Sequence, residues 1–153
     1  MSAQTTYSRY HTNAYSGQLQ GDGPKVIDTY VVETAAGIAP GVVVSKGTAD
    51  DQCVVGGDGT GIGIVVRNLD VENNASDEIV YAQGTPVGVL VEGDISVLMD
   101  GAGSKGDAIY YDDATGAIGA GAAASGATAL TGVLAETIAG IAVARVRLNR
   151  QGS

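Results

Sequence analysis

Glycine interrupts this chain of 153 residues at 24 positions, and short runs of Val, Ile, Leu and Ala lie between the glycines. β-branched residues favour strands, whereas Gly, Pro, Asp and Asn supply the backbone conformations of tight turns. The strand candidates are, in chain order, KVIDTYVVE, GVVVSKG, QCVV, GIGIVVRNL, TPVGVLVE, DISVLMD, DAIYYD, TALTGVLAE and IAVARVRLN. This pattern predicts an all-β fold, a small glycine-rich β-barrel or sandwich-like domain with an extended N-terminal arm.

Three local structures are predicted from turn chemistry. TPVGVLVE and DISVLMD flank Gly93 and Asp94, which suit a tight reversal, so a hairpin is expected there. In its second strand Ile95, Val97 and Met99 alternate with polar or mixed positions and should face the core. The segment GAIGAGAAASGATAL is predicted to be a loose loop, because each glycine weakens a helix by up to about 1 kcal/mol. ETIAG is predicted to be a short turn before the last strand.

Residues 1–23 differ in kind from residues 24–153, since they are rich in Ser, Thr, Gln, Asn and Gly with tyrosines interspersed. They predict an arm attached to a single β-rich domain. One interpretation is a frayed terminus, and the other is an arm that becomes ordered on a partner through flat aromatic anchors. The second is favoured. Its candidate anchors are Tyr7, Arg9, Tyr10 and Tyr15.

The formal net charge is −9, so the chain lacks the basic clusters that attract phosphates, and nucleic acid is not expected as a partner. Alternation in the C-terminal strand puts Arg145 and Arg147 on one face. That face is either solvated or contacts an acidic neighbour, such as another copy of this chain. Because no apolar stretch reaches about 18 residues and no signal peptide is evident, we expect a soluble protein made in the cytoplasm, without membrane contact.

Gly101, Gly103 and Gly106 match the GxGxxG spacing of dinucleotide-binding loops. Such a loop must open a helix, whereas the AIYYD that follows here favours a strand, so a turn is predicted instead. The one histidine, His11, lies in the arm, where it is poorly placed to serve a catalytic triad. Cys53 is predicted to be a small buried residue.

One His and one Cys cannot form the usual zinc sets, which leaves only all-oxygen cation sites. The acidic candidates are Asp50, Asp51, Asp58, Asp112 and Asp113. None has EF-hand spacing, and turns capped by their own aspartates explain them better, so no metal or cofactor is predicted. A carbohydrate-active enzyme with a carboxylate pair, or a carbohydrate-binding or adhesin module, is the alternative from another class of function.

The segments GIAPGVVVSKGT, VRNLD, GDAIYYDD, GAIG and RVRLN, in that order, resemble the structural cement or head decoration proteins of tailed bacteriophages. The resemblance implies a small β-rich, non-enzymatic protein on the outer surface of the virion. It implies the major capsid protein as a partner, clamping of neighbouring capsid subunits, and frequent assembly as a homotrimer. It also gives a role to the arm, because such proteins typically reach adjacent subunits with a terminal segment.

Overall fold

The computed structural model of the protein describes residues 15–21, 23–57, 61–68, 79–121 and 127–149. Within these ranges the chain forms strands and turns and contains no helix, which confirms the predicted all-β class. The strands are β1 (Gln18–Leu19), β2 (Val26–Val32), β3 (Val43–Lys46), β4 (Gln52–Val55), β5 (Gly61–Val65), β6 (Pro86–Met99), β7 (Ala108–Asp112), β8 (Ile118–Ala120), β9 (Ala127–Leu134) and β10 (Ala142–Leu148).

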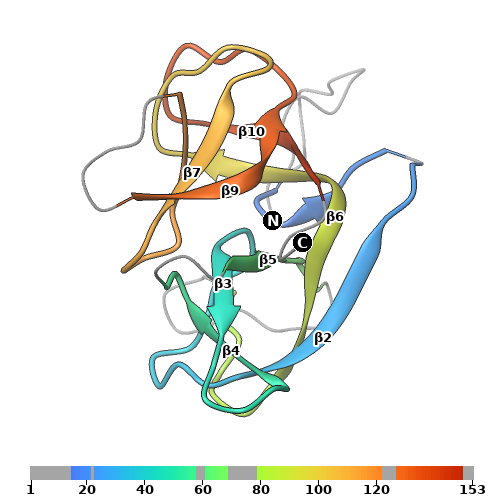
Figure 1. Cartoon of the computed structure of the whole chain (residues 1–153), viewed down its shortest axis with the longest axis vertical. Coiled ribbons are helices and arrows are strands. Elements are labelled where there is room, and N and C mark those ends of the chain that lie inside the picture. Colours follow the sequence, from blue (N-terminus) through green and yellow to red (C-terminus); the bar gives the residue numbers. More distant parts are fainter. Residues whose placement is uncertain (1–14, 22, 58–60, 69–78, 122–126, 150–153) are drawn as a thin grey trace, which may run out of the picture.

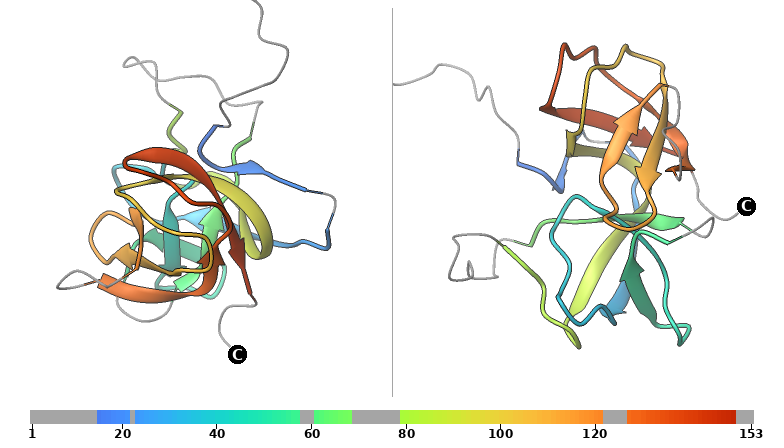
Figure 2. Two further views of the ribbon diagram at one scale, coloured as in Figure 1. Left: turned by 90° about the horizontal axis from the view of Figure 1, so that it is seen from above. Right: turned by 90° about the vertical axis from the view of Figure 1, so that its left-hand side faces the viewer.

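The strand pairings close two rings that share the long strand β6. The first half of β6 joins the ring β6–β2–β4–β3–β5, and its second half joins the ring β6–β10–β9–β7–β8. Figures 1 and 2 show the result as two stacked lobes with β6 running from one into the other. We call them the N-terminal barrel and the C-terminal barrel. The predicted barrel is therefore confirmed, although the closed rings could not be read from the sequence.

The predicted hairpin at Gly93 is wrong, because both runs belong to the single strand β6. Gly93 has a φ of +131°, and a Cβ there would lie 3.0 Å from a side-chain carbon of Lys25. This glycine lets the strand turn a corner between the barrels without reversing it. Each half of β6 pairs with other strands, β2 and β5 before the corner and β10 and β1 after it. The two halves therefore have no need to pair with each other.

Strands β3, β5 and the first half of β6 are buried on both faces. In each of these strands, one residue packs in one hydrophobic core and its neighbour in the other. Val43, Ile64 and Leu90 pack in the core of the C-terminal barrel. Their neighbours Val44, Val65 and Val89 pack in the core of the N-terminal barrel. A sheet covered on both faces reads as a continuous apolar run without alternation. This explains why GVVV, GIVV and GVLV lack a polar face.

Beyond the corner, β6 alternates as predicted. Ile95, Val97 and Met99 are buried, whereas Leu98 is exposed. The C-terminal strand β10 follows the same rule, with Val146 buried. The predicted loose loop after Gly116 is wrong at Ile118–Ala120, which forms β8, and residues 122–126 lie outside the described ranges. ETIAG forms bends before β10, and its Ile138 makes an isolated β-bridge with Gly103.

Within the predicted arm the structure describes residues 15–21 and 23, and it pairs two of them with the domain. β1 pairs with β6 through Gln18 and Leu19, and Gly17 donates a 2.7 Å backbone hydrogen bond to Ser96. Leu19 packs against the core of the C-terminal barrel. Gln18 and Leu19 thus form a sheet element within the predicted arm, and Tyr15 is the first described residue.

Candidate functional site

The two acidic residues at the end of β7 both accept hydrogen bonds from neighbouring residues. The Asp112 carboxylate accepts hydrogen bonds from the backbone N–H groups of Ala114 and Thr115, at 2.8 and 3.0 Å. The N–H of Thr115, followed by that of Ala114, lowers the pKa of Asp112. Asp113 accepts a 2.5 Å hydrogen bond from the Thr128 hydroxyl. The turn interpretation is confirmed for Asp112, whereas Asp113 is held by a residue of β9.

The other candidates for chemistry have different surroundings, and Asp51 is exposed just before β4. Asp50 forms an ion pair with Lys46 at 2.6 Å, and Asp58 lies outside the described residues, as does His11. Cys53 is fully buried, and desolvation, with a smaller contribution from Glu33, raises the pKa of its thiol to about 11. Among the described residues, no group of three or more His, Cys, Asp or Glu side chains is placed to hold a metal ion.

The GxGxxG segment forms a turn, as predicted. The Asp107 carboxylate accepts a 2.9 Å hydrogen bond from the Ser104 N–H, and β7 starts directly afterwards. No helix N-terminus is formed there to hold a phosphate. The described residues form no helix, and so they include no helix that could cross a membrane.

The outward face of β6 and β10, by contrast, gathers exposed apolar and basic side chains. Leu98 is the register partner of Val143, and Arg145 lies opposite Ser96. Leu98 is 53% exposed and Ile141, just before β10, is 74% exposed, although both are large and apolar. We define the β6–β10 outer face as Tyr15, Leu98, Ile141, Val143, Arg145 and Arg147.

Tyr15 is held at the edge of this face. Its backbone N–H donates to the Gln18 side chain at 3.1 Å, and the neighbouring Ser16 hydroxyl accepts the Leu98 N–H at 3.2 Å. The Arg67 guanidinium lies 4.6 Å above the centre of the Tyr15 ring, within the range of a cation–π contact. The ring is nevertheless 63% exposed and can contact another molecule.

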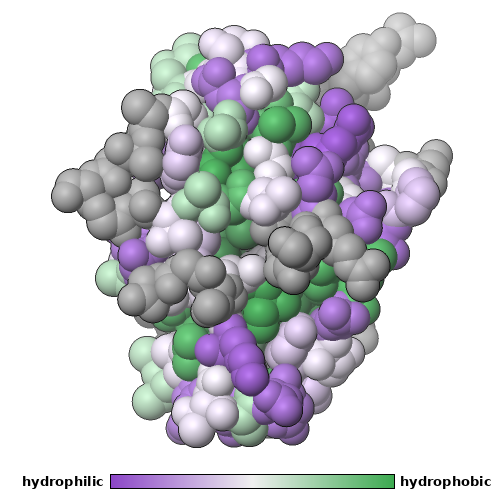
Figure 3. Space-filling view, in the orientation of Figure 1, coloured by the Kyte–Doolittle hydropathy of each residue, from purple (hydrophilic) through white to green (hydrophobic). Residues whose placement is uncertain are grey.

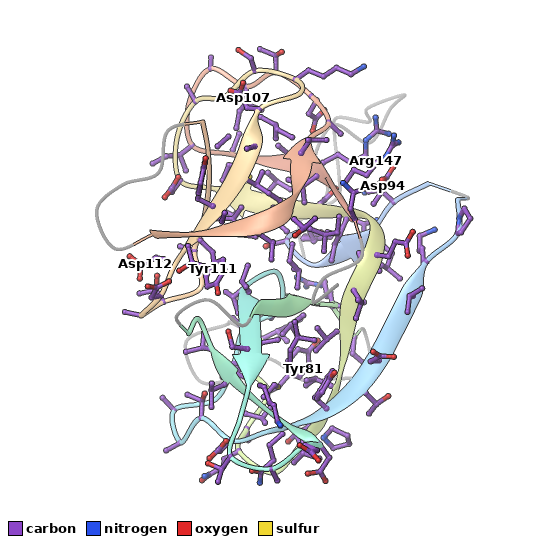
Figure 4. All side chains as sticks on the ribbon, viewed as in Figure 1. Tyr81, Asp94, Asp107, Tyr111, Asp112 and Arg147 are labelled. Atoms are coloured by element: carbon purple, nitrogen blue, oxygen red, sulfur yellow. The ribbon has the colours of Figure 1, made fainter. Side chains whose placement is uncertain are left out.

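The two arginines of β10 differ in their partners. Arg147 donates two hydrogen bonds to the Asp94 carboxylate, at 2.8 and 3.2 Å, yet its side chain remains 60% exposed. Figure 4 shows this pair beside the corner of β6, on the opposite side of the view from Asp112. Among the described residues no carboxylate lies within 4.0 Å of the Arg145 guanidinium. Arg145 is therefore the better placed of the two to meet an acidic group on a partner.

A hollow of about 270 Å³ adjoins the Asp94–Arg147 pair at the corner, where the chain between β1 and β2 loops away from β6. Lys25 borders it, and its ammonium group donates to the backbone carbonyls of Gly21 and Gly23. The basic groups around the hollow are thus already engaged, and we assign no ligand to it.

Of the predicted contact residues, Arg145 and Arg147 lie on one face of β10, and Tyr15 lies near Leu98 of β6 through its neighbour Ser16. Tyr7, Arg9 and Tyr10 lie outside the described residues. That any of them contacts a partner remains a prediction. Sequence reasoning missed Leu98, Ile141 and Val143, although the position of Leu98 on the polar side of an alternating strand was a usable signal.

The comparisons with known proteins agree with this architecture. Residues 3–149 match the family model described as "Structural cement protein (E217 gp24/Pam3 gp6)". This chain belongs to the structural cement protein family. A chain in the solved structure titled "The capsid of Myoviridae Phage XM1" has the same fold, with a TM-score of 0.75 and 21% sequence identity over 97% of this chain and 98% of that chain. No curated protein matches the sequence significantly.

The Asp94–Arg147 pair of this cement protein predicts a specific pH dependence. The hydrogen bond from Arg147, more than any other cause, lowers the pKa of Asp94 in the folded protein. The stabilisation is therefore present above the pKa of an unfolded aspartate and is lost as the pH falls through the lower, folded value. Asp94→Asn should slightly reduce the free energy of unfolding at pH 6, and the difference from the parent should shrink toward pH 2 in urea titrations.

Arg147→Gln and the double variant complete a double-mutant cycle for this pair. The coupling measured at pH 6 should be small, because Arg147 is largely exposed, and it should vanish at pH 2. A loss of stability in Asp94→Asn that is equally large at both pH values would contradict the ion-pair explanation.

Proposed function

We propose that this protein binds the outer surface of an assembled phage capsid and holds neighbouring major capsid subunits together. Membership of the structural cement protein family gives the general role. The observation that supports a binding surface is the β6–β10 outer face, where Leu98 and Ile141 stand exposed beside arginines on a chain of net charge −9. We further propose a homotrimer, built in the host cytoplasm, as the unit that binds.

The chemistry of this face suits an apolar partner surface edged with carboxylates. Burial of exposed apolar side chains contributes about 25 cal/mol per Å² removed from water. Arginine forms forked hydrogen bonds with carboxylates, so Arg145 can orient the contact. Each such contact must break before the subunits that it joins can separate. Many modest contacts repeated over a shell therefore give a large resistance to rupture.

Shells with and without this protein provide the test of the cement role. We expect undecorated shells to rupture at a lower temperature and under weaker osmotic shock than decorated ones, because the added contacts are lost. Thermal release of DNA, followed with an intercalating dye, measures the rupture temperature. Equal rupture temperatures would refute cementing.

Single variants locate the binding surface. Leu98→Ser and Arg145→Ser should each reduce shell binding several-fold in a cosedimentation titration, because each removes an exposed contact group from the face. Lys105→Ser is the matched control: it removes the same charge as Arg145→Ser from an exposed turn outside the β6–β10 outer face. If Lys105→Ser weakens binding as much as Arg145→Ser, net charge rather than this face controls attachment.

A further inference from the structure

Along one edge of β2, part of the backbone is not paired with any other described residue. The N–H groups of Val31 and Glu33 donate to Asp51 and Cys53 on the β4 side, whereas that of Val32 donates to Thr85 on the β6 side. Backbone groups alternate in direction along a strand. Ile27 and Thr29 therefore point their N–H and C=O groups away from β6, but β4 pairs only with Val31 and Val32. No described residue satisfies these groups, and Figure 1 shows β2 at the outside of the N-terminal barrel.

The side chains along this edge are also unusually open. Val26 and Ile27 are 38% and 43% exposed, and Asp28 and Thr29 are exposed as well. Tyr30 is half-buried against the core of the N-terminal barrel. Proteins usually protect a free edge with a lysine, a proline or a covering loop, because such an edge pairs readily with another strand. Between Val26 and Thr29 the only charged side chain is that of Asp28. The edge therefore suits an incoming strand that carries a basic side chain.

We propose that residues 7–11 of a second copy of this chain add to this edge as an antiparallel strand. The segment QTTYSRYHT, residues 4–12, is rich in β-favouring Thr and Tyr and contains no Gly, Pro, Asp or Glu. With Arg9 opposite Asp28, the other partners also match. They are Tyr7 with Tyr30, Ser8 with Thr29, Tyr10 with Ile27 and His11 with Val26. Aromatic, β-branched and opposite-charge pairs of this kind each stabilise a sheet by roughly 0.2–1 kcal/mol.

Chain length favours a second copy over the chain's own edge. In this register residue 11 lies beside Val26, whose partner on β6 is Glu92. Tyr15, in contrast, is held near Leu98, because the hydroxyl of its neighbour Ser16 accepts the Leu98 N–H. At about 3.3 Å per residue, Glu92 and Leu98 are about 17 Å apart even if β6 bends at a right angle. The four steps from residue 11 to Tyr15 span at most about 14 Å. The segment can therefore reach this register on a neighbour more easily than on its own domain.

Disulfide trapping tests the exchange directly in the purified full-length protein. Asp28 lies at a non-hydrogen-bonded position relative to an incoming strand, where Cα atoms come to about 4.5 Å, a distance suited to a disulfide. A mixture of Arg9→Cys protein and tagged Asp28→Cys protein should give a covalent heterodimer under mild oxidation. The parent, whose Cys53 is buried, should give none. Absence of the heterodimer in the mixture would overturn the proposal.

Two further variants separate the edge from other causes. Thr29→Pro in the Asp28→Cys chain removes an outward N–H and should lower the heterodimer yield at least tenfold, whereas Thr29→Ala keeps the N–H and should preserve it. A protein carrying both cysteines that cross-links only within one chain would show that the arm returns to its own edge, and would overturn exchange between copies. Binding to shells is scored separately, so the capsid role and this exchange can fail independently.

Discussion

Gly56→Ala is expected to lower the free energy of unfolding by at least about 3 kcal/mol. Gly56 has a φ of +68°, and a Cβ there would lie 2.2 Å from the carbonyl oxygen of Asp113. The contact joins the two barrels, since the adjacent Gly57 N–H donates to that same oxygen at 2.8 Å. A methyl group must therefore push the loop after β4 away from the turn after β7. Urea unfolding followed by circular dichroism measures the loss.

Gly84→Ala is the matched control for this experiment. Gly84 has a similar positive φ of +87°, but a Cβ there meets nothing within 4 Å. The control should therefore show only the cost of a left-handed conformation, about 1–2 kcal/mol. If both variants lose the same amount, the close approach of Gly56 to Asp113 adds nothing to the cost of a side chain at this position.

The contact around Gly56 shows which parts of the fold could be predicted from the sequence. Turn residues and β-branched runs located β2 to β7, β9 and β10, because those signals are local. They could not reveal that GGDGTG and YDDATG meet, since that contact depends on how far the barrels close. The region between the lobes is where hydrophobic side chains show at the centre of Figure 3, with hydrophilic ones toward the two ends.

The error at Gly93 has a similar origin. EGD between two apolar runs is a sound local signal for a hairpin, but a strand can also bend at glycine when each half finds separate partners. β1 was missed for a different reason. It has only two residues, Gln18 and Leu19, and they pair with β6 beside Ser96, whose carbonyl accepts the Gly17 N–H. Tertiary pairing thus determines both the bend of β6 and the formation of β1, and the local sequence of either segment does not predict it.

The candidate contact surface was predicted only in part. Alternation in β10 put Arg145 and Arg147 outside correctly, because the period of a strand is fixed. The same reasoning indicated a mixed face for Ser96 and Leu98 but could not say which of them is covered. Ser96 is 3% exposed, whereas Leu98 is 53% exposed. Which of the two is covered depends on tertiary packing, and alternation within one strand does not encode it.

Removal of residues 2–14 is expected to weaken attachment to shells at least tenfold, which corresponds to about 1.4 kcal/mol. The deletion leaves β1 in place, so the β-rich domain should still fold and unfold in one cooperative urea transition. Two effects contribute to the loss: Tyr7, Arg9 and Tyr10 no longer make contacts, and copies that are no longer joined by arms bind the shell one at a time without avidity.

A longer deletion, of residues 2–20, separates attachment from folding. It removes β1 and the Gly17–Ser96 hydrogen bond, so it should lower the free energy of unfolding as well as binding. Quantitative cosedimentation with shells, at protein concentrations on both sides of half-saturation, distinguishes the two deletions. Unchanged affinity in the shorter one would mean that the first residues are a frayed end, and that the β6–β10 outer face alone holds the protein on the capsid.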